Sequence, residues 1–353
     1  MARAIEEQTV LRAVITLLAL VIVTATLRAD VKSDCLQAGS GPKDTDGRIK
    51  ACTELLRQNP GNAAAYHNRG IAFVRRKNSG DAARAVADFN MAIGLEPRSI
   101  TYLARGSLFL SGGGWKAAIA DFTMAITLDP HSAIAYRRRG EGHKNAGDAE
   151  LEQSQRSAIA VCAAEKRFAD CRSVNDGMLA DYVKAMELAI TDYTKALELV
   201  PNDVHTYWLR GEAARAKKDD DLMIADHTKA LEINPQYQGD WIHVSLGMAY
   251  AGKRDFDRAL AHYTKALEIW PKAQTYRLRA ETYLKASRPG EGLPDVERAL
   301  TLRADDPSAL TTRGEILEAL GRTDEAIADY RKVAAKHPRS TAMEHLKRLG
   351  AAP

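Results

Sequence analysis

The chain has 353 residues, of which 45% are hydrophobic, 6% aromatic and 27% charged. Its 50 basic and 46 acidic side chains leave a net charge of only +4, which argues against a dedicated binder of nucleic acid or another polyanion. A mixed charge at this density favours a solvated helical surface. The length suggests two or three globular domains, or one elongated array if the chain is built from repeats.

The first predicted element is a targeting segment over residues 1–29. Residues 13–27 form an uncharged run of 15 residues between two arginines, typical of a signal peptide core and short for a membrane span of about 20 residues. Ala25 and Ala29 offer two cleavage points. Three interpretations remain open: a cleaved signal peptide, an uncleaved anchor over residues 10–27, and a cytoplasmic helix. We expect an exported chain, periplasmic or extracellular, that contacts the membrane only if the segment is uncleaved.

Four cysteines form two local pairs in the sequence. Cys35 and Cys52 are 17 residues apart, and Cys162 and Cys171 are 9 residues apart. Neither spacing fits a zinc site, and an even number of cysteines in an exported chain indicates disulfides. We therefore predict one bridge within each pair. The alternative is that Cys52 is a buried thiol, and in a cytoplasmic chain neither bridge is expected.

Both ends of the chain are predicted to be caps. Residues 30–60 are expected to form a disulfide-tied segment that ends in a lone helix over residues 46–60, because an array of stacked helices exposes an apolar face at its end. Residues 339–353 are expected to form the opposite cap, with apolar residues at three-residue steps: Met343, Leu346 and Leu349.

Residues 61–338 repeat one pattern, seen most clearly between Ser99 and Pro130. Small residues, aromatic residues and a closing proline lie at positions 4, 8, 11, 20, 24, 27 and 32 of this unit: Tyr102, Gly106, Phe109, Ala118, Phe122, Ala125 and Pro130. A small residue at positions 8 and 20 allows two antiparallel helices to approach closely, and the aromatic side chains fill the space beside them. The same register recurs with these residues at position 8: Gly70, Gly106, Gly140, Gly211, Gly247, Ala280 and Gly314.

This spacing resembles that of the tetratricopeptide repeat family over residues 46–349, with only the unit near residues 273–306 degraded. The resemblance implies an all-α fold, an α-solenoid of antiparallel helix pairs with about seven repeats. It also implies that the chain forms one superhelical array.

The register breaks between Pro130 and Pro201, which are 71 residues apart. This stretch is either two repeats or one repeat with a helical insertion near residues 148–185. Elsewhere an arginine at position 7 accompanies an aspartate at position 23: Arg69 with Asp88, Arg105 with Asp121, Arg210 with Asp226, Arg279 with Asp295, and Arg313 with Asp329. The insertion pairs Arg139 with Asp192 in the same way, so we favour a protruding hairpin with Cys162 and Cys171 near its tip. The Gly247 unit loses both partners, to Leu246 and His262.

Motifs of catalysis, nucleotide binding and metal binding are absent from the sequence. We find no HExxH, GxxxxGK[ST], GxGxxG or GxSxG, and the nine histidines are scattered through the repeats. His227 and His262 occupy positions 24 and 23, where we interpret them as packing or register residues. We predict a protein without catalytic activity, cofactor or bound metal, and without nucleic acid as a partner.

In the tetratricopeptide repeat family, positions 2, 5, 9 and 12 of each first helix line the concave face. The resemblance therefore implies a groove for a protein or peptide partner, whose candidate binding residues are His67, Arg137, His205, Trp208, Arg215, Trp241, Met248 and Arg277. Tryptophan and arginine are favoured at binding hot spots, although either tryptophan could instead cover a neighbouring helix.

The sequence thus predicts a non-catalytic protein–protein interaction scaffold in an exported, envelope-associated complex. The alternative is a carbohydrate or small ligand bound through Trp208 and Trp241. Partner identity and oligomeric state are left open.

Overall fold

The computed structural model describes residues 31–36, 45–165 and 170–352, with side chains throughout except at residues 157–178. Within these ranges every regular element is a helix, which confirms the all-α fold class. The contacts divide the chain into two compact units, residues 1–201 and 202–353, which we describe separately. The predicted targeting segment over residues 1–29 lies outside the described residues. In the described part, no helix combines the length and apolar character that crossing a bilayer requires.

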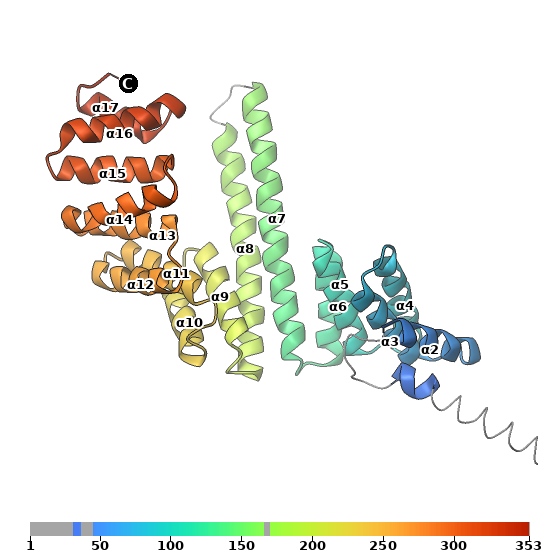
Figure 1. Ribbon diagram of the computed structural model, residues 1–353. Coiled ribbons are helices and arrows are strands. Elements are labelled where there is room, and N and C mark those ends of the chain that lie inside the picture. Colours follow the sequence, from blue (N-terminus) through green and yellow to red (C-terminus); the bar gives the residue numbers. More distant parts are fainter. Residues whose placement is uncertain (1–30, 37–44, 166–169, 353) are drawn as a thin grey trace, which may run out of the picture. The chain divides into compact units, whose positions relative to one another are not determined.

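Unit 1 is a stack of helix pairs (Figure 1). α2 packs on α3, and the pairs that follow are α3 with α4, α5 with α6, and α7 with α8. The helices are α2 (Thr45–Gln58), α3 (Ala63–Arg76), α4 (Asp81–Leu95), α5 (Ser99–Ser111), α6 (Trp115–Leu128), α7 (Ala133–Glu165) and α8 (Asp170–Leu199).

Unit 2 stacks four further pairs and ends in a short helix (Figure 1). The helices are α9 (Val204–Ala216), α10 (Asp220–Ile233), α11 (Gly239–Gly252), α12 (Phe256–Ile269), α13 (Ala273–Lys285), α14 (Pro289–Leu302), α15 (Pro307–Ala319), α16 (Thr323–Lys336) and α17 (Thr341–Arg348). α9 pairs with α10, and so on along the chain to α15 with α16, while α17 packs on α16.

The two helices of a pair meet where a glycine faces a ring. A Cβ atom added to Gly106 would lie 2.8 Å from a ring carbon of Phe122, and one added to Gly247 would lie 2.6 Å from a ring carbon of Tyr263. The same contact joins Gly70 to Phe89, Gly140 to Tyr193, Gly211 to His227, and Gly314 to Tyr330. Position 8 is therefore small because the ring at position 24 occupies the space of a side chain.

In the degraded repeat, α13–α14, the contact between the two helices is made by different residues. This repeat carries Ala280 in place of glycine and Val296 in place of a ring, and both are fully buried in one apolar cluster. The first helix gains a methyl group and the second loses an aromatic ring. The exchange keeps the volume between the helices filled without overlap.

Six arginine–aspartate pairs tie the first helix of a repeat to its second. Arg139 Nε and Nη2 donate to Asp192 Oδ2 and Oδ1 at 2.9 and 2.7 Å. The five other predicted pairs have the same two-bonded geometry, and all six aspartates are buried. In five repeats the guanidinium also lies 5.6 to 6.0 Å from the ring centroid of the tyrosine three residues earlier: Tyr66, Tyr102, Tyr136, Tyr207 and Tyr276. All six predicted pairs are confirmed.

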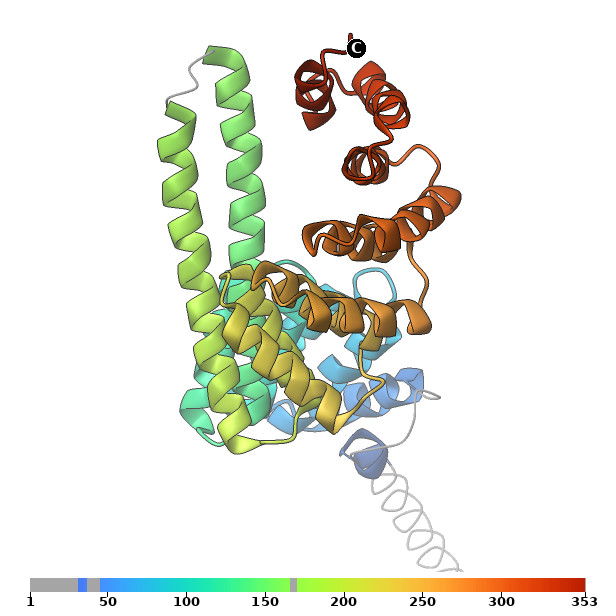
Figure 2. The same cartoon turned by 90° about the vertical axis from the view of Figure 1, so that its left-hand side faces the viewer.

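α7 and α8 are the longest helices of unit 1, with 33 and 30 residues, and they run side by side (Figure 2). The Arg139–Asp192 pair, which the insertion interpretation requires, joins them. Further along, a Cβ atom on Gly147 would lie 2.7 Å from Cβ of Ala185, so glycine allows the two helices to stay close. Cys162 and Cys171 lie among the residues whose side chains are not described, and their bridge stays a prediction.

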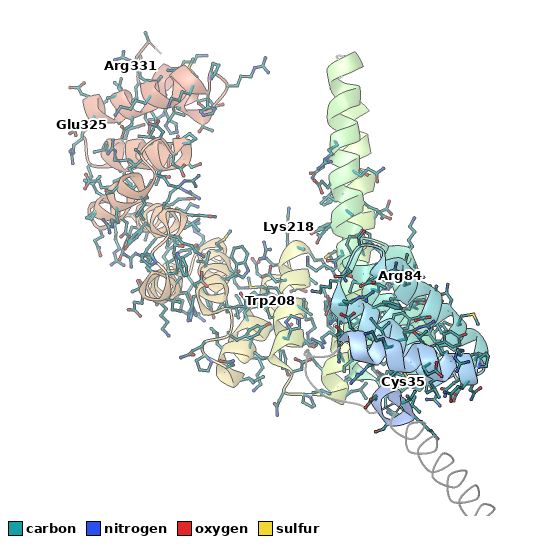
Figure 3. The ribbon with its side chains drawn as sticks, turned by 45° about the vertical axis from the view of Figure 1, so that its right-hand side comes forward. Cys35, Arg84, Trp208, Lys218, Glu325 and Arg331 are labelled. Carbon is teal, nitrogen blue, oxygen red and sulfur yellow. A yellow bond between two sulfur atoms is a disulfide. The ribbon has the colours of Figure 1, made fainter. Side chains whose placement is uncertain are left out.

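Both predicted cap segments contain a helix that packs on the adjacent repeat, α2 on α3 and α17 on α16. Cys35, in the helical residues 31–36 (Figure 3), forms the predicted disulfide with Cys52 of α2, with the two Cα atoms 4.8 Å apart. Asn68 Nδ2 of α3 donates to the backbone oxygen of Cys35 at 3.0 Å. At the other end, α17 buries Leu346 and also Ala342 against the cluster formed by α13 to α16.

Reduction of the Cys35–Cys52 bridge should lower the free energy of unfolding of unit 1 by about 3 kcal/mol, because the bridge closes a loop of 17 residues. The measurement is urea unfolding with and without a reductant, in a Cys162→Ser/Cys171→Ser background that isolates this bridge. A further Cys35→Ser/Cys52→Ser change should remove the response to the reductant. Equal stability of the oxidised and reduced forms would contradict the prediction.

Candidate partner-binding surface

Five predicted groove residues lie on α9 and α11, the first helices of the first two repeats of unit 2: His205, Trp208, Arg215, Trp241 and Met248. The helix α9, on which Figure 3 labels Trp208, is capped by Asp203. The Asp203 carboxylate accepts hydrogen bonds from the backbone N–H groups of His205 and Thr206. With the start of the helix fixed in this way, residues three and four positions apart share one face, which brings His205, Trp208 and Arg215 to the same side.

His205, Trp208 and Tyr237 form a packed aromatic cluster. The His205 ring stacks on Trp208, with centroids 5.7 Å apart, and its Nδ1 lies 2.5 Å from the hydroxyl of Tyr237. Tyr237 also meets Trp208 edge-on at 6.5 Å. Trp208 is consequently half-buried, and its Nε1 atom is inaccessible to solvent.

Tyr237 escaped the sequence analysis because it lies in the connection between α10 and α11. A signal was present, since Gly211 and Gly247 are 36 residues apart whereas the repeat is 34 residues long. The two additional residues lengthen this connection.

Trp241 differs from Trp208 in being 43% exposed. Its Nε1 donates to Glu212 Oε1 at 3.4 Å, and the guanidinium of Arg215 lies 5.9 Å from its ring centroid. Met248, two turns further along the same face of α11, is 47% exposed. We call Arg215, Trp241 and Met248 the groove patch.

Glu212 contacts both Arg215 and Trp241 of the groove patch. It is 7% exposed, and its Oε2 accepts a hydrogen bond from Arg215 Nη2 at 2.8 Å. Nε2 of the fully buried His227 lies 3.5 Å from Glu212 Oε1. Burial is the main cause that lowers the pKa of His227 to about 4, so this imidazole is neutral at pH 7. Its position against Gly211 agrees with the packing role predicted for it.

The predicted groove residues of unit 1 are His67 and Arg137. His67 Nδ1 of α3 is 3.1 Å from Thr101 Oγ1 of α5, and burial lowers the pKa of this half-buried side chain. Arg137 lies on α7 and is half-buried. The position 2 residues Ile100 and Ile134 are 60% and 55% exposed, so apolar surface is available at groove positions of this unit.

A concavity of about 900 Å³ lies near the C-terminal end of unit 2. It is bounded by groove-position residues of α13 and α15 and by the connection after α16, including Glu281, Ser308, Thr311, Glu315 and residues 336–341. Arg277, a predicted groove residue, donates a hydrogen bond from Nη1 to Glu281 Oε2 at 3.0 Å, so its positive charge is partly neutralised. Burial raises the pKa of Glu315. Within the described ranges, no three His, Cys, Asp or Glu side chains are placed to hold a metal ion.

Comparisons with known proteins place this geometry in context. Residues 242–272 and 277–341 match two family models, each described as tetratricopeptide repeat. Protein unc-45 homolog B of Xenopus laevis is 38% identical over 80 residues, which are 22% of this chain and 9% of that protein, so the chain spans only a small part of that relative.

Among solved structures, PilW, a type IV pilus biogenesis factor, is 17% identical over 70% of this chain and 97% of its own, with a TM-score of 0.49. YrrB, a tetratricopeptide repeat protein with an unusual peptide-binding site, is 18% identical over 63% of this chain and 95% of its own, with a TM-score of 0.48.

Proposed function

We propose, from the premise that this chain is a tetratricopeptide repeat protein, that it is a non-catalytic scaffold whose first helices bind a protein or peptide partner. Each unit offers its own candidate surface: the groove patch in unit 2 and, separately, the exposed apolar groove positions Ile100 and Ile134 in unit 1. The scaffold acts in an exported, envelope-associated complex. The disulfide between Cys35 and Cys52 supports export, because such bridges persist in oxidising compartments.

The observation that carries the proposal is the exposure of Trp241 and Met248 on one face of α11 beside Arg215. Large apolar side chains at solvent-exposed positions gain free energy when a partner covers them. An arginine whose bonds to Glu212 fix its orientation can contact a peptide backbone or carboxylate with little loss of side-chain entropy. Binding at this surface depends on removing apolar side chains from water and on a partner whose shape fits the groove, and it includes no covalent step.

A carbohydrate or small ligand is the alternative occupant. It needs open ring faces at Trp208 and Trp241 for stacking. His205 covers one face of Trp208, whereas Trp241 is accessible, so the geometry favours a protein partner over a sugar held by both rings.

Affinity capture from the native compartment tests the proposal. We expect specific partners to be retained by the wild-type chain and to be reduced at least about tenfold by Trp241→Ala/Met248→Ala, since truncating hot-spot residues costs about 2 kcal/mol each. Trp270→Ala is the matched control, because Trp270 is 62% exposed but lies at the end of a second helix.

Equal loss of the captured partners with the Trp270→Ala control and with the double variant would contradict the proposed surface. A glycan that quenches the fluorescence of Trp241 would instead support the alternative. Sequencing of the mature N-terminus tests export, which predicts that residues 1–29 are removed or membrane-associated.

A further inference from the structure

One repeat of unit 2 lacks the tie that joins the helices of its neighbours. Five repeats combine a tyrosine at position 4, an arginine at position 7 and an aspartate at position 23 in one stacked and hydrogen-bonded group. The α11–α12 repeat has His243, Leu246 and His262 at these positions. Leu246 is fully buried and apolar, so any polar tie between these two helices, beside the fit of Gly247 against the ring of Tyr263, has to come from another contact.

The two histidines form that contact. His243 Nδ1 on α11 lies 3.0 Å from His262 Nδ1 on α12, so one imidazole donates a hydrogen bond and the other accepts it. Tyr250 of α11 stacks on His262, with ring centroids 5.5 Å apart and planes within 8°. His243 is only 8% exposed.

We propose that the α11–α12 repeat is an acid-sensitive joint, held at neutral pH by the hydrogen bond between His243 and His262 and opened when both imidazoles are protonated. A bond between two Nδ1 atoms requires that one of them lacks a proton. The second proton removes this acceptor and places two positive charges side by side. The arginine–aspartate pairs of the neighbouring repeats contain no imidazole, so protonation of a histidine does not remove their hydrogen bonds.

The surroundings of the pair oppose protonation in the closed repeat. Burial, the charge of His243 and that of Lys265, in this order, lower the pKa of His262 to about 4. Burial is also the main cause that lowers the pKa of His243, again with Lys265, while Glu268 acts in the opposite direction.

The charged groups on the elements packed around the pair are mostly neutralised by partners of their own. They include Arg258 of α12 with the N-cap residue Asp255, Asp240 of α11 with Lys272, Lys229 with Glu232 on α10, and Arg279 with Asp295 between α13 and α14. Arg258 also lies over the ring of Tyr250, 4.8 Å from its centroid.

The sign of the effect follows from these shifts. In the opened repeat an imidazole regains an ordinary pKa of 6.5, above its value in the closed repeat. The opened form therefore binds more protons, and opening is favoured as the pH falls below about 6.5 and levels off below about 4. His262 alone predicts an increase of about 30-fold in the opening equilibrium between pH 7.5 and pH 5.0.

Hydrogen exchange of the full chain, followed by mass spectrometry at these two pH values and corrected for intrinsic exchange rates, tests the joint. After this correction, we expect the protection of the α11 and α12 amides to be about 30-fold lower at pH 5.0 than at pH 7.5. The α13–α14 repeat, which keeps Arg279 and Asp295, is the internal reference and should change little. An equal response in both repeats would overturn the proposal.

Two variants isolate the cause. His243→Tyr/Leu246→Arg/His262→Asp installs the tyrosine, arginine and aspartate of the neighbouring repeats and should abolish the acid response. His227→Phe removes the other buried histidine of unit 2, in α10, and should leave the response in place. A response lost with His227→Phe, or kept in the triple variant, would overturn the assignment.

If the triple variant does not fold, NMR titration of the wild-type histidines decides. Both His243 and His262 should then titrate below 6.5 in the closed form, and ordinary values for both would overturn the proposal. Because the joint carries Trp241 and Met248, acid is expected to alter the groove patch. That consequence rests on the proposed function, whereas the exchange experiments need no partner.

Discussion

Replacing Asp192 by alanine should destabilise the α7–α8 pair by about 3 kcal/mol, because it leaves a partly buried guanidinium without its counter-charge. Asp192 is 4% exposed and accepts two hydrogen bonds from Arg139. Native-state hydrogen exchange of α7 and α8 measures the loss. The effect should be confined mainly to this pair and its direct neighbours, since each repeat contacts chiefly the adjacent ones.

Two comparisons make this result specific. Glu198→Ala breaks an ion pair with Lys195 on the same helix, but both side chains are exposed, so we expect a change of about 0.5 kcal/mol or less. Replacing both partners, with Arg139→Met/Asp192→Ala, should cost less than the two single changes combined. Additive single effects would show that the contact does not tie these helices together.

Gly247→Ala should destabilise unit 2 by about 2 kcal/mol. The added Cβ atom would lie 2.6 Å from the ring of Tyr263, and overpacking at such a site costs about 3 kcal/mol, whereas the better helix propensity of alanine returns about 1 kcal/mol. Tyr263→Val alone should cost about 3 kcal/mol through the cavity that it leaves.

The double variant Gly247→Ala/Tyr263→Val reproduces the alanine and valine of α13–α14, so it should be no less stable than Tyr263→Val alone. Urea unfolding measures all three variants. Gly290→Ala is the control, because nothing lies within 4 Å of a Cβ atom at that position. A stable Gly247→Ala variant would refute the packing argument.

Much of the helical framework could be predicted from the sequence. In each repeat the glycine that faces an aromatic ring, and the arginine that pairs with an aspartate, recur at fixed positions. Both partners of each contact can therefore be recognised in the sequence. The pairing of Arg139 with Asp192 therefore follows from the repeat register although 53 residues separate them. The disulfide between Cys35 and Cys52 is also predictable, because the chain has only four cysteines and these two are close in sequence.

Other contacts depend on geometry that the repeat register does not encode. Tyr237 reaches Trp208 from an irregular connection, and the bond between His243 and His262 replaces an ion pair with residues that carry no sign of pairing. The concavity beside Glu315 depends on the path of the chain after α16. Trp241 is exposed whereas Trp208 is half-buried, and the spacing of residues in a repeat does not predict this difference. The groove residues themselves stay a prediction.

The match between a glycine and a ring is completed inside each helix pair, and this has a consequence for rebuilding the molecule. A whole helix pair can be moved to another position in the chain, because the glycine and the ring that it contacts are moved together. A hybrid that joins the first helix of α13–α14 to the second helix of α11–α12 would set Ala280 against Tyr263 and fail. Recombination that cuts between pairs keeps the fit, whereas a crossover within a pair that sets Ala280 against a ring does not.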